Sequence, residues 1–280
     1  MGRPTNAQAR EEAGRGPAAP AAAAGERTVT ELVILLQEGE DDGVATTAAL
    51  LDELWSAQYL APGALCAFAG DAVSLPGRPL VTPAATHALA LRFGAPAAAQ
   101  HFVDHPAFSA PASTAIASGL LARPPTVLAF ETRAPDDLEP LFRRGPEWEA
   151  GLDLCLVFAP APSQPAPGAG DPVCSPDAFV SDLAALAESS LAGALQACPG
   201  RLVSPPTTFP GGATHALVAR FELASQAAAF LALPPLVAAA GGVEAAAAAG
   251  SPLLLVAVEA WSIAPAAAGN QQAPPVGAPR

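Results

Sequence analysis

The chain has 280 residues, of which 51% are hydrophobic and only 14% are charged, so it contains enough apolar material for two small domains. Its net charge of −13 argues against nucleic acid and anionic membranes as partners, because both attract clustered basic side chains. All 13 basic residues are Arg, which excludes a lysine as Schiff base, phosphate ligand or general base.

The first 27 residues are rich in Ala, Arg, Gly and Pro. This composition fits a disordered tail or an organelle transit peptide, and Glu11, Glu12 and Glu26 argue against the transit peptide. The sequence contains no run of about 18 consecutive apolar residues, which is the length needed to span a membrane. We therefore expect a soluble, intracellular, cytoplasmic protein with tails at 1–27 and 265–280, and organelle import remains the alternative.

The first predicted strand is the run of branched and aliphatic residues at 30–35. A helix follows Thr46 or Thr47, which are favourable N-cap residues, and we expect it to end at Pro62 and Gly63. The predicted apolar stripe of this helix consists of Leu50, Leu51, Leu54, Trp55 and Tyr59.

Residues 86–93 alternate between two faces with the period of a strand. His87 shares one face with Leu89, Leu91 and Phe93, and Arg92 lies on the other. An Ala-rich helix that ends near Pro106 and a strand at 126–132 follow. The order is therefore strand, helix, strand, strand, helix, strand.

The second half repeats this pattern at an offset of 128 residues through its best-matched part. Residues 85–89 and 92–93 recur at 213–217 and 220–221. We infer a first module at 28–135, a linker at 136–148 and a second module at 149–264.

The second copy carries clearer helix signals than the first. Ser175 is a good N-cap, Pro176 suits the first helical position, and Asp177 lies near the positive end of the helix dipole. The alignment matches Pro199 and Gly200 to Pro62 and Gly63, so this helix is also expected to stop there. The last strand is predicted at 253–261.

Two helices beside a four-stranded antiparallel sheet form the ferredoxin-like arrangement. Such a sheet leaves one face uncovered, and a second copy on the same chain could cover it at high effective concentration. The predicted class is α+β, with tandem ferredoxin-like modules of the dimeric α/β barrel type. Their antiparallel sheets would pack face to face as an internal pseudo-dimer.

Two short patterns, Thr86-His87-Ala88-Leu89 and the run from Phe102 to Ala107, resemble the stress-responsive α/β barrel (Dabb) family in tandem form. The resemblance covers both modules and neither tail. It implies a barrel made by two sheets, and some members are similar to polyketide cyclases with a pocket between sheet and helices.

This resemblance implies a ligand pocket formed by His87, Phe102, His105, His215 and Phe230. His87 and His215 match the strand histidine of the cyclase pattern. Other donors are replaced: Glu31 and Asp153 stand for a histidine, Phe102 and Phe230 for a tyrosine, and Phe108 and Leu236 for a second histidine. These replacements argue against cyclase activity.

The histidines allow more than one interpretation. His87 and His215 could be hydrogen-bonded core residues, or acid–base groups in a pocket. His101 and His105 lie four apart on a predicted helix, so they could ligate a metal or haem, although a solvated helix end is the simpler interpretation. We therefore expect no metal and no cofactor, and take His87, His215 and His105 as the catalytic candidates.

Glu131 and Glu259 repeat on the last strands. Burial alone would raise their pKa values, whereas pairing with Arg92 and Arg220 would make them structural, and we favour the pairing.

The favoured function is that of a stress-response barrel protein that is non-enzymatic or binds a small hydrophobic ligand. The alternative is a cofactor-independent enzyme of polyketide cyclase or monooxygenase type that uses a pocket around His87 or His215.

Overall fold

The computed structural model describes eight parts of the chain: residues 25–40, 46–73, 75, 85–135, 151–161, 174–203, 212–249 and 251–263. The predicted linker at 136–148, the tail at 265–280 and most of the tail at 1–27 lie outside these parts. Glu26 and Arg27, at the end of the predicted first tail, belong to the first strand.

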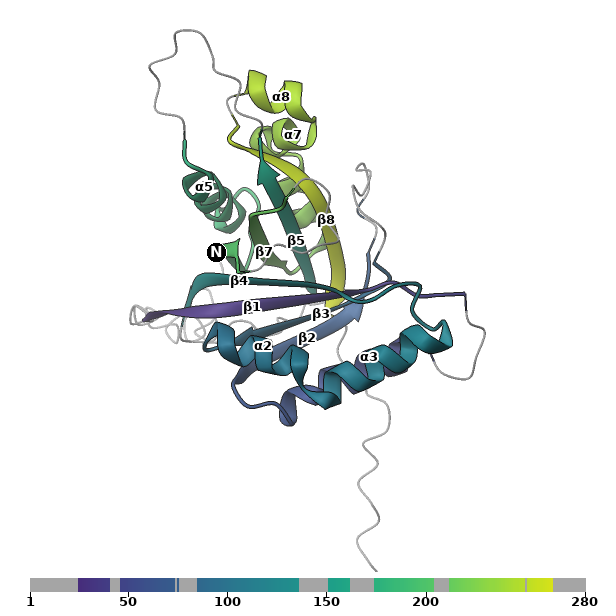
Figure 1. The fold of residues 1–280 in the computed structure, drawn as a ribbon. Helices are drawn as coiled ribbons and strands as arrows, with labels where there is room; N and C mark the ends of the chain where they lie inside the picture. The colour runs from purple at the N-terminus through teal and green to yellow at the C-terminus, as the bar shows by residue number, and fades with distance from the viewer. Residues whose placement is uncertain are drawn as a thin grey trace, which may run out of the picture.

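The described residues of the N-terminal half form four strands and three α-helices, arranged as Figure 1 shows. Its elements are β1 (Glu26–Leu36), α1 (Thr47–Ser56), the 3-10 turn η3 (Ala57–Tyr59), β2 (Ala64–Asp71), β3 (His87–Phe93), α2 (Pro96–Asp104), α3 (Pro106–Ser118) and β4 (Thr126–Pro135). Helices α2 and α3 lie along the outer side of this sheet.

In the described residues of the C-terminal half the same order recurs with one further helix. Its elements are β5 (Gly151–Pro160), α5 (Pro176–Glu188), β6 (Gln196–Leu202), β7 (His215–Phe221), α6 (Ala224–Leu231), α7 (Pro234–Ala240), α8 (Val243–Ala248) and β8 (Leu253–Ile263). The strands predicted at 126–132 and 253–261 are thus confirmed and slightly longer.

The eight strands form one antiparallel sheet in the order β2-β3-β1-β4-β6-β7-β5-β8. The first four strands of this order have the ferredoxin-like arrangement, and so do the last four. The halves join where β4 pairs with β6, with Phe130 opposite Leu202 and Glu131 opposite Arg201. The predicted α+β fold class is confirmed.

The two outer strands of this order also meet, so the sheet closes on itself as a barrel. Ala72 bridges Trp261, and the backbone N–H of Val73 donates to the carbonyl oxygen of Ala260 at 2.7 Å. The two sheets therefore face each other across a shared interior and are also joined along both edges. The two joints, β4–β6 and β2–β8, are called the seams below.

Apolar side chains form three separate layers. One core lies between the first sheet and its helices, and a second lies between the second sheet and its helices. A third lies inside the barrel and draws side chains from both halves, among them Val33, Leu128 and Phe130 from the first and Val157 and Trp261 from the second. This shared interior core holds the halves together, since neither sheet could bury that face alone.

Two glycines allow the close approach of strands at the seams. A Cβ on Gly70 in β2 would overlap the carbonyl oxygen of Ser262 in β8, and one on Gly200 in β6 would overlap that of Glu131 in β4. Gly200 and Pro199 thus lie inside a strand, and the prediction that they end a helix was wrong. Only the match of Pro62 and Gly63 to a helix end holds, because Gly63 adopts a positive φ of 99° just after η3.

The predicted helix starts are confirmed. The Thr46 hydroxyl accepts from the Ala49 N–H at 3.2 Å, and the Ser175 hydroxyl accepts from the Ala178 N–H at the same distance. Tyr59, however, is 73% exposed and does not belong to the core stripe. Helix α1 ends at Ser56, so the chain has already turned before Tyr59.

The prediction that the second helix of each copy ends near Pro106 or Pro234 is right about the ending but omits a further helix. Each proline occupies the first turn of that helix, α3 or α7, where a missing N–H costs no hydrogen bond. The chain therefore adds helical cover to each sheet beyond the predicted pair of helices.

Candidate functional site

His215 lies at the first position of β7, and both of its ring nitrogens have partners. Nε2 is 3.1 Å from the Asp177 carboxylate, and Nδ1 is 2.8 Å from the Thr214 hydroxyl. The side chain is only 7% exposed. An imidazole held at both nitrogens is well oriented, but it offers no lone pair or N–H to a substrate in this arrangement.

Asp177 orients His215 from the first turn of α5, where the Ser175 cap fixes the start of the helix. It also accepts two hydrogen bonds from Arg201 of β6, at 2.7 and 2.6 Å. These hydrogen bonds from Arg201, together with the one from His215, lower the pKa of Asp177 to about 2. The carboxylate is therefore ionised at any ordinary pH.

These residues line a groove of about 460 Å³ beside the β4–β6 seam. Its other walls come from β1, β4, α5 and β6, and include Thr28, Glu131, Thr132, Arg133, Val180, Ser181, Pro199 and Gly200. The volume falls within the range of about 300–1,000 Å³ that is typical of small-molecule sites. The groove combines apolar walls with several hydrogen-bonding groups.

His87 occupies the equivalent position at the start of β3, but its surroundings differ. Its Nε2 lies 3.4 Å from the carboxylate of Asp71, which faces it on β2, and its Nδ1 lies 2.9 Å from the Thr86 hydroxyl. In the second copy, the residue that faces His215 from the neighbouring strand β6 is Arg201, whereas Asp71 faces His87 in the first copy. Among the residues that the structure describes, only those of the second copy build the composite of histidine, helix aspartate and arginine.

The other predicted pocket residues do not lie in the groove. Phe102 is fully buried and packs against Phe93 at a centroid distance of 5.6 Å, and Phe230 packs likewise against Phe221 at 5.8 Å. Both belong to the cores between sheet and helices. The structure thus places His215 in an open groove and separates it from the two phenylalanines.

His105 and His101 lie at the junction of α2 and α3. His105 is the N-cap of α3, and its Nδ1 accepts the Ala107 N–H at 3.2 Å. The two imidazole rings stand edge to face, with centroids 5.6 Å apart. Within the described parts of the chain, no group of three His, Cys, Asp or Glu side chains is arranged to hold a metal ion.

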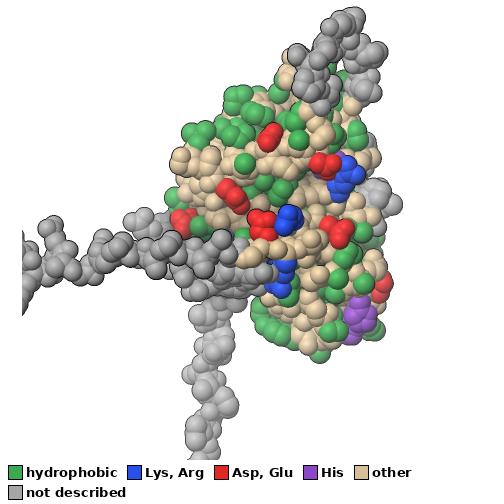
Figure 2. Space-filling model, turned by 90° about the vertical axis from the view of Figure 1, so that its left-hand side faces the viewer, with side chains coloured by type: hydrophobic (Ala, Val, Ile, Leu, Met, Phe, Trp, Pro, Cys, Tyr) green, Lys and Arg blue, Asp and Glu red, His purple; other side chains and the backbone are tan. Residues whose placement is uncertain are grey.

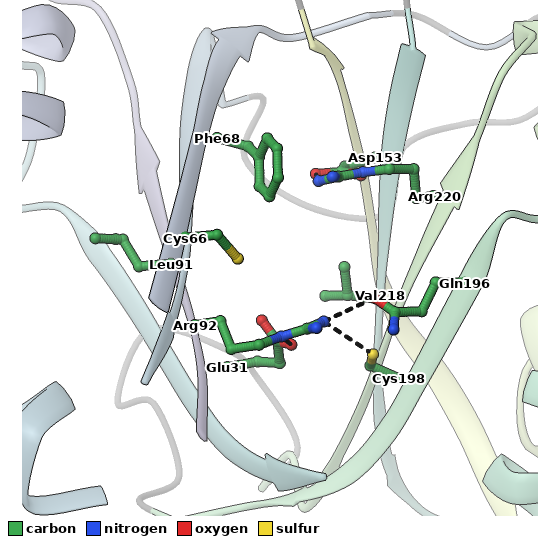
Figure 3. Close-up of a pocket in the computed structure, with 10 residues that line it drawn as sticks. All are labelled: Glu31, Cys66, Phe68, Leu91, Arg92, Asp153, Gln196, Cys198, Val218 and Arg220. Atoms are coloured by element: carbon green, nitrogen blue, oxygen red, sulfur yellow. Dashed lines mark hydrogen bonds and ion pairs between the residues drawn. The ribbon is translucent and has the colours of Figure 1, made fainter. Parts of the chain in front are cut away.

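A second candidate site, which the sequence did not indicate, is a cavity of about 30 Å³ inside the barrel (Figure 3). Its lining comes from both halves and consists of Glu31, Cys66, Phe68, Leu91, Arg92, Asp153, Gln196, Cys198, Val218 and Arg220. Figure 3 shows Arg92 and Arg220 reaching the same space from strands of opposite halves.

The cavity contains two buried ion pairs at equivalent positions. Arg92 faces Glu31 in the β1–β3 register and donates to it at 2.5 Å. Arg220 faces Asp153 in the β5–β7 register and donates to both of its oxygens, at 2.7 and 2.6 Å. The preference for Glu131 as partner of Arg92 was therefore wrong, and Glu131 is exposed on β4.

Glu31 and Asp153 are the residues that replace the first-strand histidine in the family resemblance. Each of these acids lies directly across from an arginine on the neighbouring strand. An acid at the same position of the first strand in both copies was therefore the signal that could have located this cluster. The signal was weak because the sequence alone does not show which residues of neighbouring strands lie opposite one another.

Burial shifts the ionisation of several groups around this cavity. It raises the pKa of Glu31 above its ordinary value, and the nearby Arg92 guanidinium only partly offsets the effect. Burial also raises the pKa of Cys66 to about 11 and that of Cys198 further still. Both thiols are therefore protonated near neutral pH and are poor nucleophiles.

A third hollow, of about 870 Å³, lies on the outer surface between α1 and α3. Its lining is mostly small or apolar, and Glu53 is its single ionisable residue. It offers few groups that could orient a ligand or transfer a proton.

The surface shown in Figure 2 carries basic and acidic side chains beside one another, with apolar side chains scattered between them. The described parts of the chain contain no helix that is long and apolar enough to cross a membrane.

No protein-family model matches the sequence, and no curated protein matches it. Solved structures match at the level of the fold. An anthrone oxidase-like protein is 8% identical to this chain, with a TM-score of 0.50 over 85% of this chain and 91% of its own.

Two further solved structures match less well. A candidate monooxygenase from Fusobacterium nucleatum has 6% identity and a TM-score of 0.48 over 85% of this chain and 91% of its own. A dimeric protein of unknown function and ferredoxin-like fold from Bacteroides fragilis has 13% identity and a TM-score of 0.28, over 37% of this chain and 95% of its own. At such identities only the fold is shared: the chain is an α+β protein of the ferredoxin-like, dimeric-barrel type.

Proposed function

We propose that this chain is a tandem stress-response α/β barrel (Dabb) protein that binds a small, mainly apolar molecule and catalyses no reaction. Its modules would span 28–135 and 149–264 and form an internal pseudo-dimer. The observation that carries the proposal is the groove beside the β4–β6 seam, in which His215 is fixed at both ring nitrogens.

The groove has the composition of a binding site. Val180 and Pro199 supply apolar contact area, whereas Thr132, Ser181 and Arg201 supply hydrogen-bonding groups around it. Such a combination suits a ligand with an apolar body and one polar substituent, because a few placed polar groups are enough to orient it.

The proposal of binding without catalysis rests on two observations: both nitrogens of His215 are already hydrogen-bonded, and the buried thiols are protonated. A general base needs a nitrogen within hydrogen-bond reach of the proton it removes, and both nitrogens of His215 already have partners. The buried thiols of Cys66 and Cys198 are protonated, so neither is activated as a nucleophile.

A groove-filling substitution tests the binding function. Ser181 is exposed on α5 and lines the groove, so Ser181→Trp should fill the groove and leave the cores intact. The adjacent Asp182 is also exposed on α5 but does not line the groove, and Asp182→Trp is the matched control.

The measurement is the shift in unfolding temperature with a panel of phenols, naphthols and anthrones. A ligand that raises the unfolding temperature of the wild type and of D182W, but not of S181W, supports the proposal. Equal stabilisation of both variants would place binding outside the groove, and no stabilisation by any compound would argue against a small apolar ligand.

The second candidate function is a cofactor-independent enzyme of cyclase or monooxygenase type. It is favoured by one observation: a buried imidazole is held by an ionised carboxylate in a groove open to solvent, as in many acid–base pairs. Rotation of the Thr214 hydroxyl would release Nδ1 for proton transfer.

Because one fold neighbour is an anthrone oxidase-like protein, oxygen consumption with an anthrone is a direct test of this alternative. Turnover by the wild type that is abolished in His215→Gln and retained in D182W would establish an enzyme and overturn the non-enzymatic proposal. Absence of turnover with an anthrone that binds would support binding alone.

A further inference from the structure

The interior cavity contains two buried cationic groups that each have an unused donor. The side chains of Arg92 and Arg220 are 6% and 7% exposed. The Nη1 atom of each has no hydrogen-bond partner among the described residues, although both atoms are fully buried. A buried charged group with unmatched N–H donors is costly, so an occupant that accepts hydrogen bonds would stabilise the site.

The other nitrogens of both arginines each have at least one partner, so Nη1 is the one nitrogen of each guanidinium without a partner among the described residues. Arg92 uses Nε for Glu31, and its Nη2 contacts the Gln196 oxygen at 2.8 Å and the Cys198 sulphur at 3.4 Å. Arg220 uses Nε and Nη2 for Asp153, and its guanidinium stacks on the Phe68 ring, 3.6 Å from the centroid.

The acceptor groups of the wall, on Glu31, Asp153 and Gln196, already accept from the two arginines, and the rest of the wall offers few others. Leu91, Val218 and Phe68 are apolar, and burial keeps the thiol of Cys66 protonated. A water molecule is the competing occupant, because its oxygen can also accept from the two Nη1 groups. A species that only accepts hydrogen bonds suits the wall better.

The cavity limits the size of that species. A volume of about 30 Å³ exceeds the roughly 10–15 Å³ needed for one water molecule but excludes a drug-sized ligand. A halide ion or a small planar oxyanion fits this range.

We propose that this cavity binds a small monovalent anion, of the size of bromide or nitrate, between the Nη1 groups of Arg92 and Arg220. The two carboxylates of the cluster do not occupy this position, because each is held against another edge of its own arginine. The anion would cross-link the two halves, since Arg92 is on β3 and Arg220 is on β7.

Glu31 offers a route to charge balance. Arg92 on β3, Arg220 on β7 and Asp153 on β5 act on this carboxyl group, and its pKa is already raised by burial. Uptake of a proton by Glu31 would offset the charge of a bound anion. Stabilisation by the anion should therefore increase as the pH falls and Glu31 takes up its proton.

The first experiment compares the unfolding temperature of the full chain in sodium nitrate and in sodium gluconate at equal ionic strength. Gluconate is too large for the cavity and controls for ionic strength. We expect a higher unfolding temperature in nitrate, by several degrees, and loss of this difference in Val218→Ile, which adds a methylene to the wall and leaves every charge in place. Equal unfolding temperatures of the wild type in the two salts would overturn the proposal.

The second experiment does not depend on how well a variant folds. Crystals of the wild type grown in sodium bromide should show an anomalous peak in contact with both Nη1 atoms. A peak only on the outer surface, or an interior that contains only water, would overturn the proposal even if nitrate stabilises the protein.

Discussion

At the scale of single residues, the chain contains two Arg–Asp pairs of nearly identical geometry in opposite environments. Arg220 donates to Asp153 at 2.7 and 2.6 Å inside the barrel, and Arg201 donates to Asp177 at 2.7 and 2.6 Å on the surface. Asp153 is fully buried, whereas Asp177 is 52% exposed. The comparison therefore contrasts a buried pair with an exposed one, and in the exposed pair Asp177 also accepts from His215.

We expect Asp153→Asn to lower the free energy of unfolding by about 3–5 kcal/mol, because it leaves the Arg220 guanidinium uncompensated in the interior. Asp177→Asn, the matched control, should cost much less, since water screens the exposed pair. Urea unfolding at pH 7 measures both. Equal losses in the two variants would mean that the interior is solvated and that the cavity is more open than described.

At the scale of helices and strands, the strand periods and the helix caps could be predicted from the sequence because they depend on local spacing. The alternation around His87 and the caps at Thr46 and Ser175 are of this kind. The seams could not be predicted, because they depend on which strands become neighbours. Gly70 and Gly200 illustrate this: a side chain is excluded at these positions only because the backbone of another strand lies against them.

Gly70→Ala should disrupt the β2–β8 seam, because the new methyl group would overlap the backbone at Ser262. We expect a loss of about 1–3 kcal/mol in the free energy of unfolding, as for other overpacked sites. Amide exchange at Val73, whose N–H donates across this seam, should become faster. Gly94→Ala is the control, since nothing lies within 4 Å of its added Cβ. Unchanged exchange at Val73 would contradict a tight seam.

The candidate site could be predicted only in part, for a related reason. His215 was found because its strand motif is duplicated, but its partner Asp177 comes from α5, and Arg201, which donates to Asp177, comes from β6; the motif includes neither. The interior arginine cluster was missed because it needs four strands from both halves. Residues whose role depends on distant strands leave no periodic signal in the chain.

At the scale of the whole molecule, the barrel interior belongs to neither half alone. Val33 and Phe130 of the first half pack in the same core as Val157 and Trp261 of the second. Separation would expose this apolar layer together with the buried charges of both arginine pairs. The two halves should therefore unfold as one cooperative unit, although each has its own core between sheet and helices.

Two tryptophans allow this cooperativity to be measured in the full chain. Trp55 packs against the core of the first half, and Trp261 is fully buried in the shared interior. In variants that retain only one of them, with the others changed to Phe, the fluorescence transition in urea should coincide with the loss of far-ultraviolet circular dichroism. Because both signals are measured on the same variant, a change in stability caused by the Trp→Phe substitutions shifts both transitions together and does not affect the comparison. If the Trp55 signal instead changed at a urea concentration separate from the main dichroism transition, the first half would unfold independently, and the closed barrel would be two weakly joined domains.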